Sequence, residues 1–330
     1  MFELKSKPSI IGFGNCVGRL ESDGPLKQYF DLSDADSKFG MKTWEKAESE
    51  MIRRAVNVTL KKSCLSNDDI ELAFGGDLSN QCTASALAMR DSKIPYIGLY
   101  GACSTFALGI GLAALTIESG KYNRTLVISS SHYSSAERQY RFPLEYGCQR
   151  TPTAQTTVTG AGCVILEKCE DNHPCVTEFL PGRICDLGIT DANNMGAAMA
   201  PAAADTILRY FEKNNIDPNS FDCILTGDLG YEGHRIFTEL CRENGLDLGV
   251  NCNDCGKMIY DTKNQDVNSG GSGCGCSASV FTSVIMNQLC KKEIKDVLLI
   301  GTGALLNPST VLQNETIPGI AHLVRIRREK

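Results

Sequence analysis

Cys103 lies in the segment LYGACSTFALGIGLAAL, where a strand-like run is followed by apolar residues at helical spacing. This pattern places the thiol at a strand-to-helix turn. Unpaired backbone N–H groups and the positive end of a helix dipole favour an anion there, so the thiol can ionise and act as a nucleophile. The alternative is that Cys103 is a small buried residue, because free cysteine is among the residue types most often buried.

Residues 131–157 form a long connection that carries anion-binding side chains. His132 directly follows an apolar run, and strand ends in α/β folds open into binding crevices. Three arginines add positive charge: Arg138, Arg141 and Arg150. Nearby aromatic side chains could pack against a flat ligand: Tyr133, Tyr140, Phe142 and Tyr146. An arginine in a polar loop is otherwise solvated or paired with an acidic neighbour.

Four cysteines have the ligand types of a structural zinc site: Cys252, Cys255, Cys274 and Cys276. Their spacing is irregular, and Cys276 lies at a predicted helix start, so we expect no metal there. The glycine-rich run at residues 270–273 lacks the lysine of a phosphate-binding loop and predicts a tight turn. No cofactor is expected from these patterns.

Composition excludes some partners. A net charge of −6 gives the 330-residue chain no general attraction to nucleic acid or anionic lipid, either of which would need a local basic patch. Sixteen cysteines, spread through apparent strands and helices, and an N-terminus without an apolar segment indicate reduced thiols inside the cell. Residues 94–117 are uncharged over the length of a membrane span. Pro95 and several glycines favour a helix buried in the core instead.

An internal repeat indicates the organisation. Three segments recur in the same order: residues 68–78 and 221–229 are apolar strands that end in Gly-Asp-Leu, residues 101–105 and 273–277 begin helices, and residues 160–167 and 319–326 are strands. We therefore predict two similar α/β halves, residues 1–170 and 171–330.

Alternating strands and helices in each half predict a mixed, largely parallel sheet. A helix at residues 43–60, with an apolar face made by Ala47, Met51, Ala55 and Val58, would cover one sheet. The helices after Cys103 and Cys276 would lie between the sheets, which gives a five-layer α-β-α-β-α sandwich. Asp77 and Asp228 end equivalent strands, where they either cap the following helices or contact a ligand.

A duplicated α/β chain with a cysteine at the start of its central helix resembles the thiolase superfamily, which includes ketoacyl synthases. That resemblance implies a condensing site of Cys, His and Asn. In this chain, Thr226-Gly227-Asp228 stands where those enzymes have the histidine. Ser272-Gly273-Cys274 stands where they have the asparagine. An aspartate donates a hydrogen bond only when protonated. The departure predicts a protein without condensing activity, and the alternative is an acyl-transferring enzyme that uses Cys103.

Longer blocks resemble the stage V sporulation protein AD family of spore-forming Firmicutes: GDLSNQ, LYGACST, SSSHYSSAERQYRFPLEYG, TVTGAG, GRICDLGITDANNMGAAMAPAAADT, ILTGDLG, NDCGKMIY, GGSGCGCSA and GTGALLNP. The resemblance implies a dipicolinic acid-binding protein that assists dipicolinate uptake into the developing spore. It also implies membrane proteins of the uptake machinery as partners, a peripheral place on the forespore or spore inner membrane, and a homodimer that meets at the strand of residues 96–99.

Dipicolinate is a flat pyridine with two carboxylates, so it needs donors, cations and apolar faces. We expect one carboxylate near Cys103 and its helix N-terminus, with His132 among the donors. The full set of expected ligand contacts is Asp77, Cys103, His132, Arg138, Arg141, Arg150 and Asp228. The ligand could also be the calcium complex.

Overall fold

The computed structural model describes residues 1–140, 150–168 and 172–328. Strands of the first half are β2 (Ser9–Val17), β4 (Leu72–Gly76), β5 (Tyr96–Gly98), β6 (Arg124–Ser131) and β8 (Gly160–Glu167). Strands of the second half are β9 (Cys175–Leu180), β10 (Cys223–Thr226), β11 (Cys252–Asp254), β13 (Asp296–Ala304) and β14 (Gly319–Arg327). Their spatial order is β5-β4-β6-β8-β2 followed by β9-β14-β13-β10-β11, so one half mirrors the other in strand order.

Each half is a mixed sheet. The pairs β4–β5 and β4–β6 are parallel, as are β10–β11 and β10–β13, while the pairs nearer the centre are antiparallel. A single residue pair, Ser9 with Cys175, joins β2 to β9 and makes the two sheets continuous. Two short strands extend the edges: β1 (Phe2–Glu3) pairs with β9, and β3 (Leu32–Ser33) pairs with β2. The predicted boundary at residues 170 and 171 lies outside the described residues.

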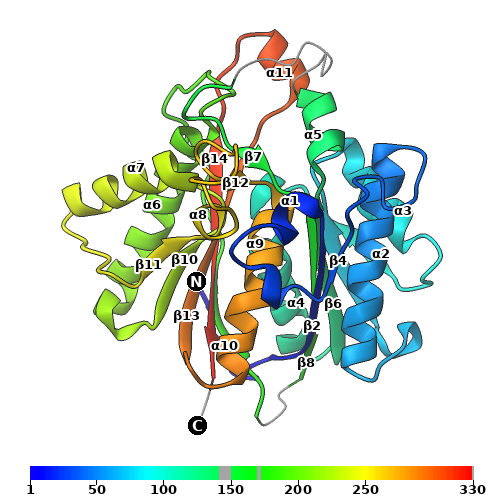
Figure 1. Cartoon of the computed structure of the whole chain (residues 1–330). Helices are drawn as coiled ribbons and strands as arrows, with labels where there is room; N and C mark the ends of the chain where they lie inside the picture. The colour runs from blue at the N-terminus through cyan, green and yellow to red at the C-terminus, as the bar shows by residue number, and fades with distance from the viewer. Residues whose placement is uncertain (141–149, 169–171, 329–330) are drawn as a thin grey trace.

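Helices complete five layers (Figure 1). The outer helices are α2 (Trp44–Lys62) and α3 (Thr83–Met89) on the first sheet, and α6 (Met195–Asn214) and α7 (Gly230–Glu243) on the second. Between the sheets lie α4 (Thr105–Glu118) and a continuous helical run of α9 (Cys274–Val280), η7 (Phe281–Ile285) and α10 (Met286–Cys290). The predicted five-layer sandwich of two similar halves is confirmed.

Shorter helices connect these layers. They are α1 (Arg19–Ser22), α5 (Tyr133–Tyr140), α8 (Cys255–Met258), α11 (Pro308–Leu312) and the 3-10 turns η1 (Lys27–Tyr29), η2 (Asn67–Asp69), η3 (Asn80–Cys82), η4 (Ala102–Ser104) and η6 (Pro218–Ser220). The helix predicted over residues 43–60 is α2, which begins after its N-cap Thr43. Ala47, Met51 and Ala55 are buried, while Val58 is only half-buried.

The uncharged stretch at residues 94–117 supplies β5, η4 and most of α4. Gly111 of α4 lies against the ring of Phe179, and a Cβ there would be 2.2 Å from the ring. Close approach of this kind explains why the central helix is rich in small residues. Over the part of the chain that the structure describes, no helix has both the length and the apolar character needed to cross a bilayer.

The two long connections, residues 131–157 and 251–273, meet above the central helices. Thr156 pairs with Gly271 and Thr157 with Ser272, as the parallel strands β7 (Thr156–Thr157) and β12 (Gly271–Ser272). The first connection also contains α5, which begins directly after His132. These connections bring segments of both halves to one end of the molecule, beside the start of α4.

Candidate functional site

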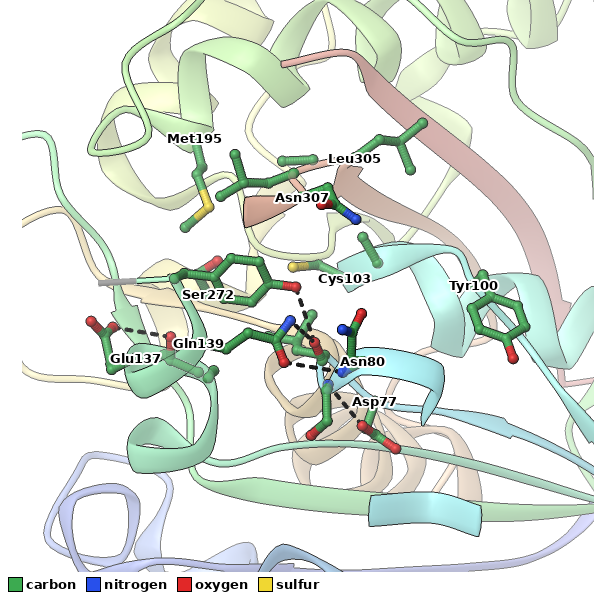
Figure 2. A pocket seen from close by; sticks show the side chains of 18 of the residues that line it. Asp77, Asn80, Tyr100, Cys103, Glu137, Gln139, Met195, Ser272, Leu305 and Asn307 are labelled. Atoms are coloured by element: carbon green, nitrogen blue, oxygen red, sulfur yellow. Dashed lines mark hydrogen bonds between the residues drawn. The ribbon is translucent and has the colours of Figure 1, made fainter. Parts of the chain in front are cut away.

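A pocket of about 290 Å³ lies at the N-terminal end of α4. Its lining is made by residues 77–82, Tyr100, Ala102, Cys103, Ala136, Glu137, Gln139, Tyr140 and residues 304–307, together with Thr157, Ser272, Ala192 and Met195. Figure 2 shows the Cys103 sulfur near the middle, with Met195 and Leu305 on one side and Asn80 and Gln139 on the other. Both halves therefore contribute walls to one small chamber, at the end of the sheets where strands β4 and β13 finish.

Cys103 occupies the predicted strand-to-helix turn. It follows Ala102 in η4, α4 begins two residues later, and its side chain is buried. Ala102 has a φ of 48°, and two further pocket residues, Gln81 and Cys82, have φ values of 58° and 49°. Residues without glycine's freedom adopt this left-handed region at a cost, and such strain is concentrated at functional sites.

Asp228, fully buried, lies beside the Cys103 thiol. One carboxylate oxygen accepts from Ser272 Oγ at 2.9 Å and Gly273 N at 2.8 Å, and the other accepts from Thr302 Oγ1 at 2.7 Å. The charge of this carboxyl group acts on the Cys103 thiol, and burial raises the pKa of Asp228 itself. The segments that the resemblance compared with the histidine and asparagine positions thus meet beside Cys103: Ser272 lines the pocket with Cys103 and donates to Asp228.

This environment suppresses the thiolate. Burial raises the pKa of Cys103 well above its usual value, and the negative charge of Asp228 raises it further. A reactive cysteine needs the opposite surroundings, such as a neighbouring imidazolium or another cation. The helix start favours the thiolate of Cys103, but burial and the charge of Asp228 disfavour it more strongly. These two effects favour the neutral thiol.

Asp77 borders the pocket and ends β4, as Asp228 ends β10. Its carboxylate accepts from Ser79 N at 2.8 Å, Ser85 N at 2.8 Å and Ser85 Oγ at 2.5 Å. These bonds hold the loop at residues 78–82 and the start of α3. Of the two roles expected for Asp77, capping is the one that its hydrogen bonds perform, because both oxygens already have donors.

His132 does not line the Cys103 pocket. Its Nε2 lies 2.7 Å from Ser37 O, its Nδ1 accepts from Ser134 N at 3.1 Å, and the ring packs 5.7 Å from that of Trp44. It borders a separate cavity near α1. Burial lowers the pKa of His132, so the neutral imidazole has both nitrogens engaged by the backbone. The expected donation to a ligand beside Cys103 is not supported.

Side-chain alternation along β6 explains this placement. Ser131 points to the central layer, where its hydroxyl accepts from Gly275 N at 3.0 Å. The residues on either side, Ser130 and His132, point to the outer layer toward Glu48 and Trp44. A histidine one position earlier would have faced the central helices.

The predicted arginines are also outside the pocket lining, as far as they are described. Arg138 pairs with Glu45 at the surface. Arg150 donates to Thr156 Oγ1 at 3.0 Å, and its guanidinium group lies over the ring of Tyr133, 5.0 Å from the centroid. Arg141 lies outside the described residues. Among the residues that the structure describes, no lysine or arginine lines the pocket, whereas Asp77 and Glu137 do.

Polar groups that the sequence analysis missed complete the pocket. Asn307 caps α11 by accepting from Ser309 N through Oδ1 at 2.8 Å, which leaves its Nδ2 as a donor. Asn80 contributes a second side-chain amide. Asn80, in the block GDLSNQ, lies just after β4, and Asn307, in the block GTGALLNP, lies just after β13. Their position after strands that end at this edge is the feature of the sequence that could have identified them.

The cysteines do not form a metal centre in the described part of the chain, where no group of three or more His, Cys, Asp and Glu side chains could hold an ion. Cys252 lies 3.7 Å from His234 Nε2. Cys255, Cys274 and Cys276 are fully buried, and Cys274 donates to Ala102 O at 2.9 Å. Every described cysteine is a free thiol.

Comparisons with known proteins agree with this architecture. The family model described as stage V sporulation protein AD (SpoVAD) matches residues 1–327. Stage V sporulation protein AD of Bacillus subtilis (strain 168) is 43% identical over 315 residues, covering 96% of this chain and 93% of that protein. Among solved structures, 3-oxoacyl-[acyl-carrier-protein] synthase III from Aquifex aeolicus VF5 matches with a TM-score of 0.59 at 16% identity, covering 97% of this chain and 99% of that one. The cerulenin-bound form of OleA from Xanthomonas campestris matches with a TM-score of 0.61 at 14% identity, covering 99% and 100%.

Proposed function

The chain belongs to the stage V sporulation protein AD family, and from this premise we propose that it is a non-catalytic dipicolinate-binding protein that assists dipicolinate uptake into the developing spore. The observation that carries the proposal is the pairing of Cys103 with Asp228. The pocket of a condensing enzyme is kept, with about 290 Å³ of space, while its nucleophile faces a buried carboxyl group instead of a histidine. Such a chamber retains the capacity to bind a small acid and lacks the means to activate the thiol.

The acidic side chains that line the pocket favour the calcium complex of dipicolinate over free dipicolinate. Free dipicolinate carries two negative charges, and the carboxyl groups that line the pocket are Asp77 and Glu137. Burial raises the pKa of Asp77, and a bound dianion would raise it further. Like charges at close range disfavour binding by several kcal/mol in a desolvated site. In the one-to-one calcium complex those charges are neutralised. We therefore propose that the ligand is the calcium complex of dipicolinate.

Shape and donors fit the same ligand. Tyr140, Met195 and Leu305 supply apolar surface for a flat ring, and Asn80 and Asn307 supply amide donors for carboxylate oxygens. Tyr140 keeps its hydroxyl on Leu78 O at 3.0 Å, which fixes the ring. Few donors and several apolar walls are typical of sites for small aromatic acids.

The test is calorimetry of the purified protein with dipicolinate, once with equimolar calcium and once with a chelator of calcium. We expect binding with calcium and at least tenfold weaker binding without it. Asn307→Ser keeps the α11 cap and removes the amide donor, and it should weaken binding by about 1.5–3 kcal/mol, the value of a hydrogen bond to a charged group. Asn314→Ser, on the same exposed loop but outside the pocket, is the matched control. If the folded Asn307→Ser variant bound dipicolinate with unchanged affinity, the ligand would have to bind outside this pocket.

The alternative function, acyl transfer through Cys103, predicts a different outcome. Incubation with acetyl-CoA or malonyl-CoA would then give a stoichiometric acyl adduct on Cys103 by mass spectrometry, together with turnover. We expect neither, because a neutral thiol is a poor nucleophile and no imidazole of the described residues lines the pocket.

The remaining expectations stand as proposals. β5 forms the free edge of the first half, and Ile97 at its centre is 45% exposed, so it can pair with β5 of a second copy in a homodimer. We place the protein in sporulating cells, on the forespore or spore inner membrane, through membrane proteins of the uptake machinery. No nucleic acid is expected as a partner.

A further inference from the structure

Two buried carboxyl groups lie beneath the pocket, and each holds one of its walls. Glu48 of α2 is 1% exposed; its Oε1 accepts from Ser130 Oγ at 2.9 Å and its Oε2 from Ser135 Oγ at 2.6 Å. Ser135 belongs to α5, whose Ala136, Glu137, Gln139 and Tyr140 form one wall. Asp77 holds the opposite wall, the loop at residues 78–82, through Ser79 and Ser85.

The two walls also touch each other. Gln139 Oε1 on α5 accepts from Asn80 N at 3.0 Å, and Tyr140 donates to Leu78 O at 3.0 Å. Repulsion between Glu48 and Asp77 would therefore act on both walls of the pocket. The chamber is small, so a modest displacement of α5 changes the space available to a ligand.

The groups that face Glu48 do not neutralise it. Asp77, at the end of β4, acts on it with a like charge. The pKa values of the Cys82 thiol, before α3, and of the Cys274 thiol, at the start of α9, are raised mainly by burial, so neither group adds positive charge. Arg138 on α5 is engaged by Glu45 at the surface. Glu48 thus receives two hydroxyl donors and no cation among the described contacts.

We propose that Glu48 is a positioning residue for the pocket: it carries a proton that lets α5 and the loop at residues 78–82 close against each other, and loss of that proton loosens both walls. Two carboxylates that share a dry site cannot both ionise without repulsion. The protonated form also suits the geometry, since a neutral carboxyl group can exchange hydrogen bonds with both seryl hydroxyls. Burial, and then the charge of Asp77, raise the pKa of Glu48 to about 8.

The sign of the pH effect follows from linkage. When α5 opens, Glu48 reaches water and its pKa returns to about 4.3. Between that pH and about 8, the closed wall holds a proton that the open wall releases. Opening is therefore favoured as the pH rises, by up to about tenfold per pH unit within this window, and levels off above it.

Hydrogen–deuterium exchange of the α5 amides, corrected for the intrinsic rate, tests this directly. Between pH 6 and pH 8 the opening equilibrium should increase by up to about 50-fold in the unmodified protein. Glu48→Gln, which mimics the protonated group, should remove this dependence. Glu50→Gln is the matched control, because Glu50 lies on the same helix but pairs with Arg53 and Arg54 at the surface. Emission of the single tryptophan, Trp44, checks that each variant is folded.

An unchanged pH dependence in folded Glu48→Gln would overturn the proposal. If that variant does not fold, Ser135→Ala decides: it removes the hydrogen bond between α5 and Glu48, so the pH dependence in α5 should fall below that at residues 78–82. Retention of the full dependence in α5 would again overturn the proposal. The consequence for ligand rests on the proposed function: dipicolinate affinity should fall from pH 6 to pH 8 in the unmodified protein only. A protein that binds no dipicolinate but shows the exchange behaviour would refute the proposed function and leave this inference standing.

Discussion

Replacing Asp228 by asparagine should make Cys103 reactive. The substitution removes the negative charge beside the thiol and keeps a side chain of the same shape, with an oxygen that can still accept from Gly273 N. Burial raises the pKa of Cys103 most, and the charge of Asp228 raises it further. Removing that charge lowers the pKa of Cys103, while the contribution of burial remains.

The rate of alkylation then follows from the thiolate fraction. Each unit by which the pKa falls raises that fraction about tenfold while the thiol remains mostly protonated, but nucleophilicity declines with pKa at a Brønsted slope of about 0.4–0.5. The net expectation is an increase of about three- to fourfold in the alkylation rate at pH 8 for each unit of that fall.

The assay is timed labelling with iodoacetamide, followed by mass spectrometry of the peptides. Cys82 borders the same pocket and serves as an internal reference, since any general loosening would expose both thiols. The ratio of Cys103 to Cys82 labelling should rise in Asp228→Asn, and the melting temperature should show a folded protein. An unchanged ratio in the folded variant would refute the reasoning, because the charge of Asp228 would not then be what silences the thiol.

Two further predictions concern stability and assembly. Glu21 is fully buried, and burial raises its pKa to about 7; the folded protein therefore holds a proton between about pH 4.5 and 7 that unfolding releases, and the free energy of unfolding falls as the pH rises through this window. Between pH 5 and pH 7 this group lowers the free energy of unfolding by about 2 kcal/mol, and Glu21→Gln should remove that loss in urea unfolding; an equal loss in both proteins would contradict the assignment. Ile97→Asp should convert the proposed dimer to a monomer in solution scattering, whereas Val250→Asp, at a site 95% exposed, should leave it a dimer.

The sequence predicted the framework well because repeats and apolar periodicity report it directly. Strands that end in Gly-Asp-Leu predicted where Asp77 and Asp228 lie, and helix starts predicted where Cys103 lies. These positions lie at the same end of the two sheets because the strands that precede them run in the same direction within each half. Side-chain direction was harder to predict: His132 differs from Ser131 by one residue, and one residue along a strand exchanges the central layer for the outer one.

Other parts of the pocket left no comparable mark in the sequence. Leu305, Asn307 and Met195 have side chains of ordinary type, and they border the chamber only because β13 and α6 bring them to its edge. Glu48 lies in the middle of an amphipathic helix, where an acidic residue is normally solvated. Its burial depends on α5 covering that turn of α2, which is a tertiary contact that helical periodicity cannot reveal.

The acidic floor of the pocket links the two functional proposals. Asp77 and Asp228 follow equivalent strands, so the symmetry of the fold buries a carboxyl group at each of these two positions. Asp77 lines the pocket together with Cys103, and the charge of Asp228 acts on the Cys103 thiol. The same charges that disfavour a thiolate disfavour a free dianion, and only a ligand that brings positive charge, such as calcium dipicolinate, escapes that repulsion. The two measurements must therefore agree. If dipicolinate bound equally well without calcium, the carboxyl groups would have to be neutral, and Asp228→Asn would then leave the reactivity of Cys103 unchanged.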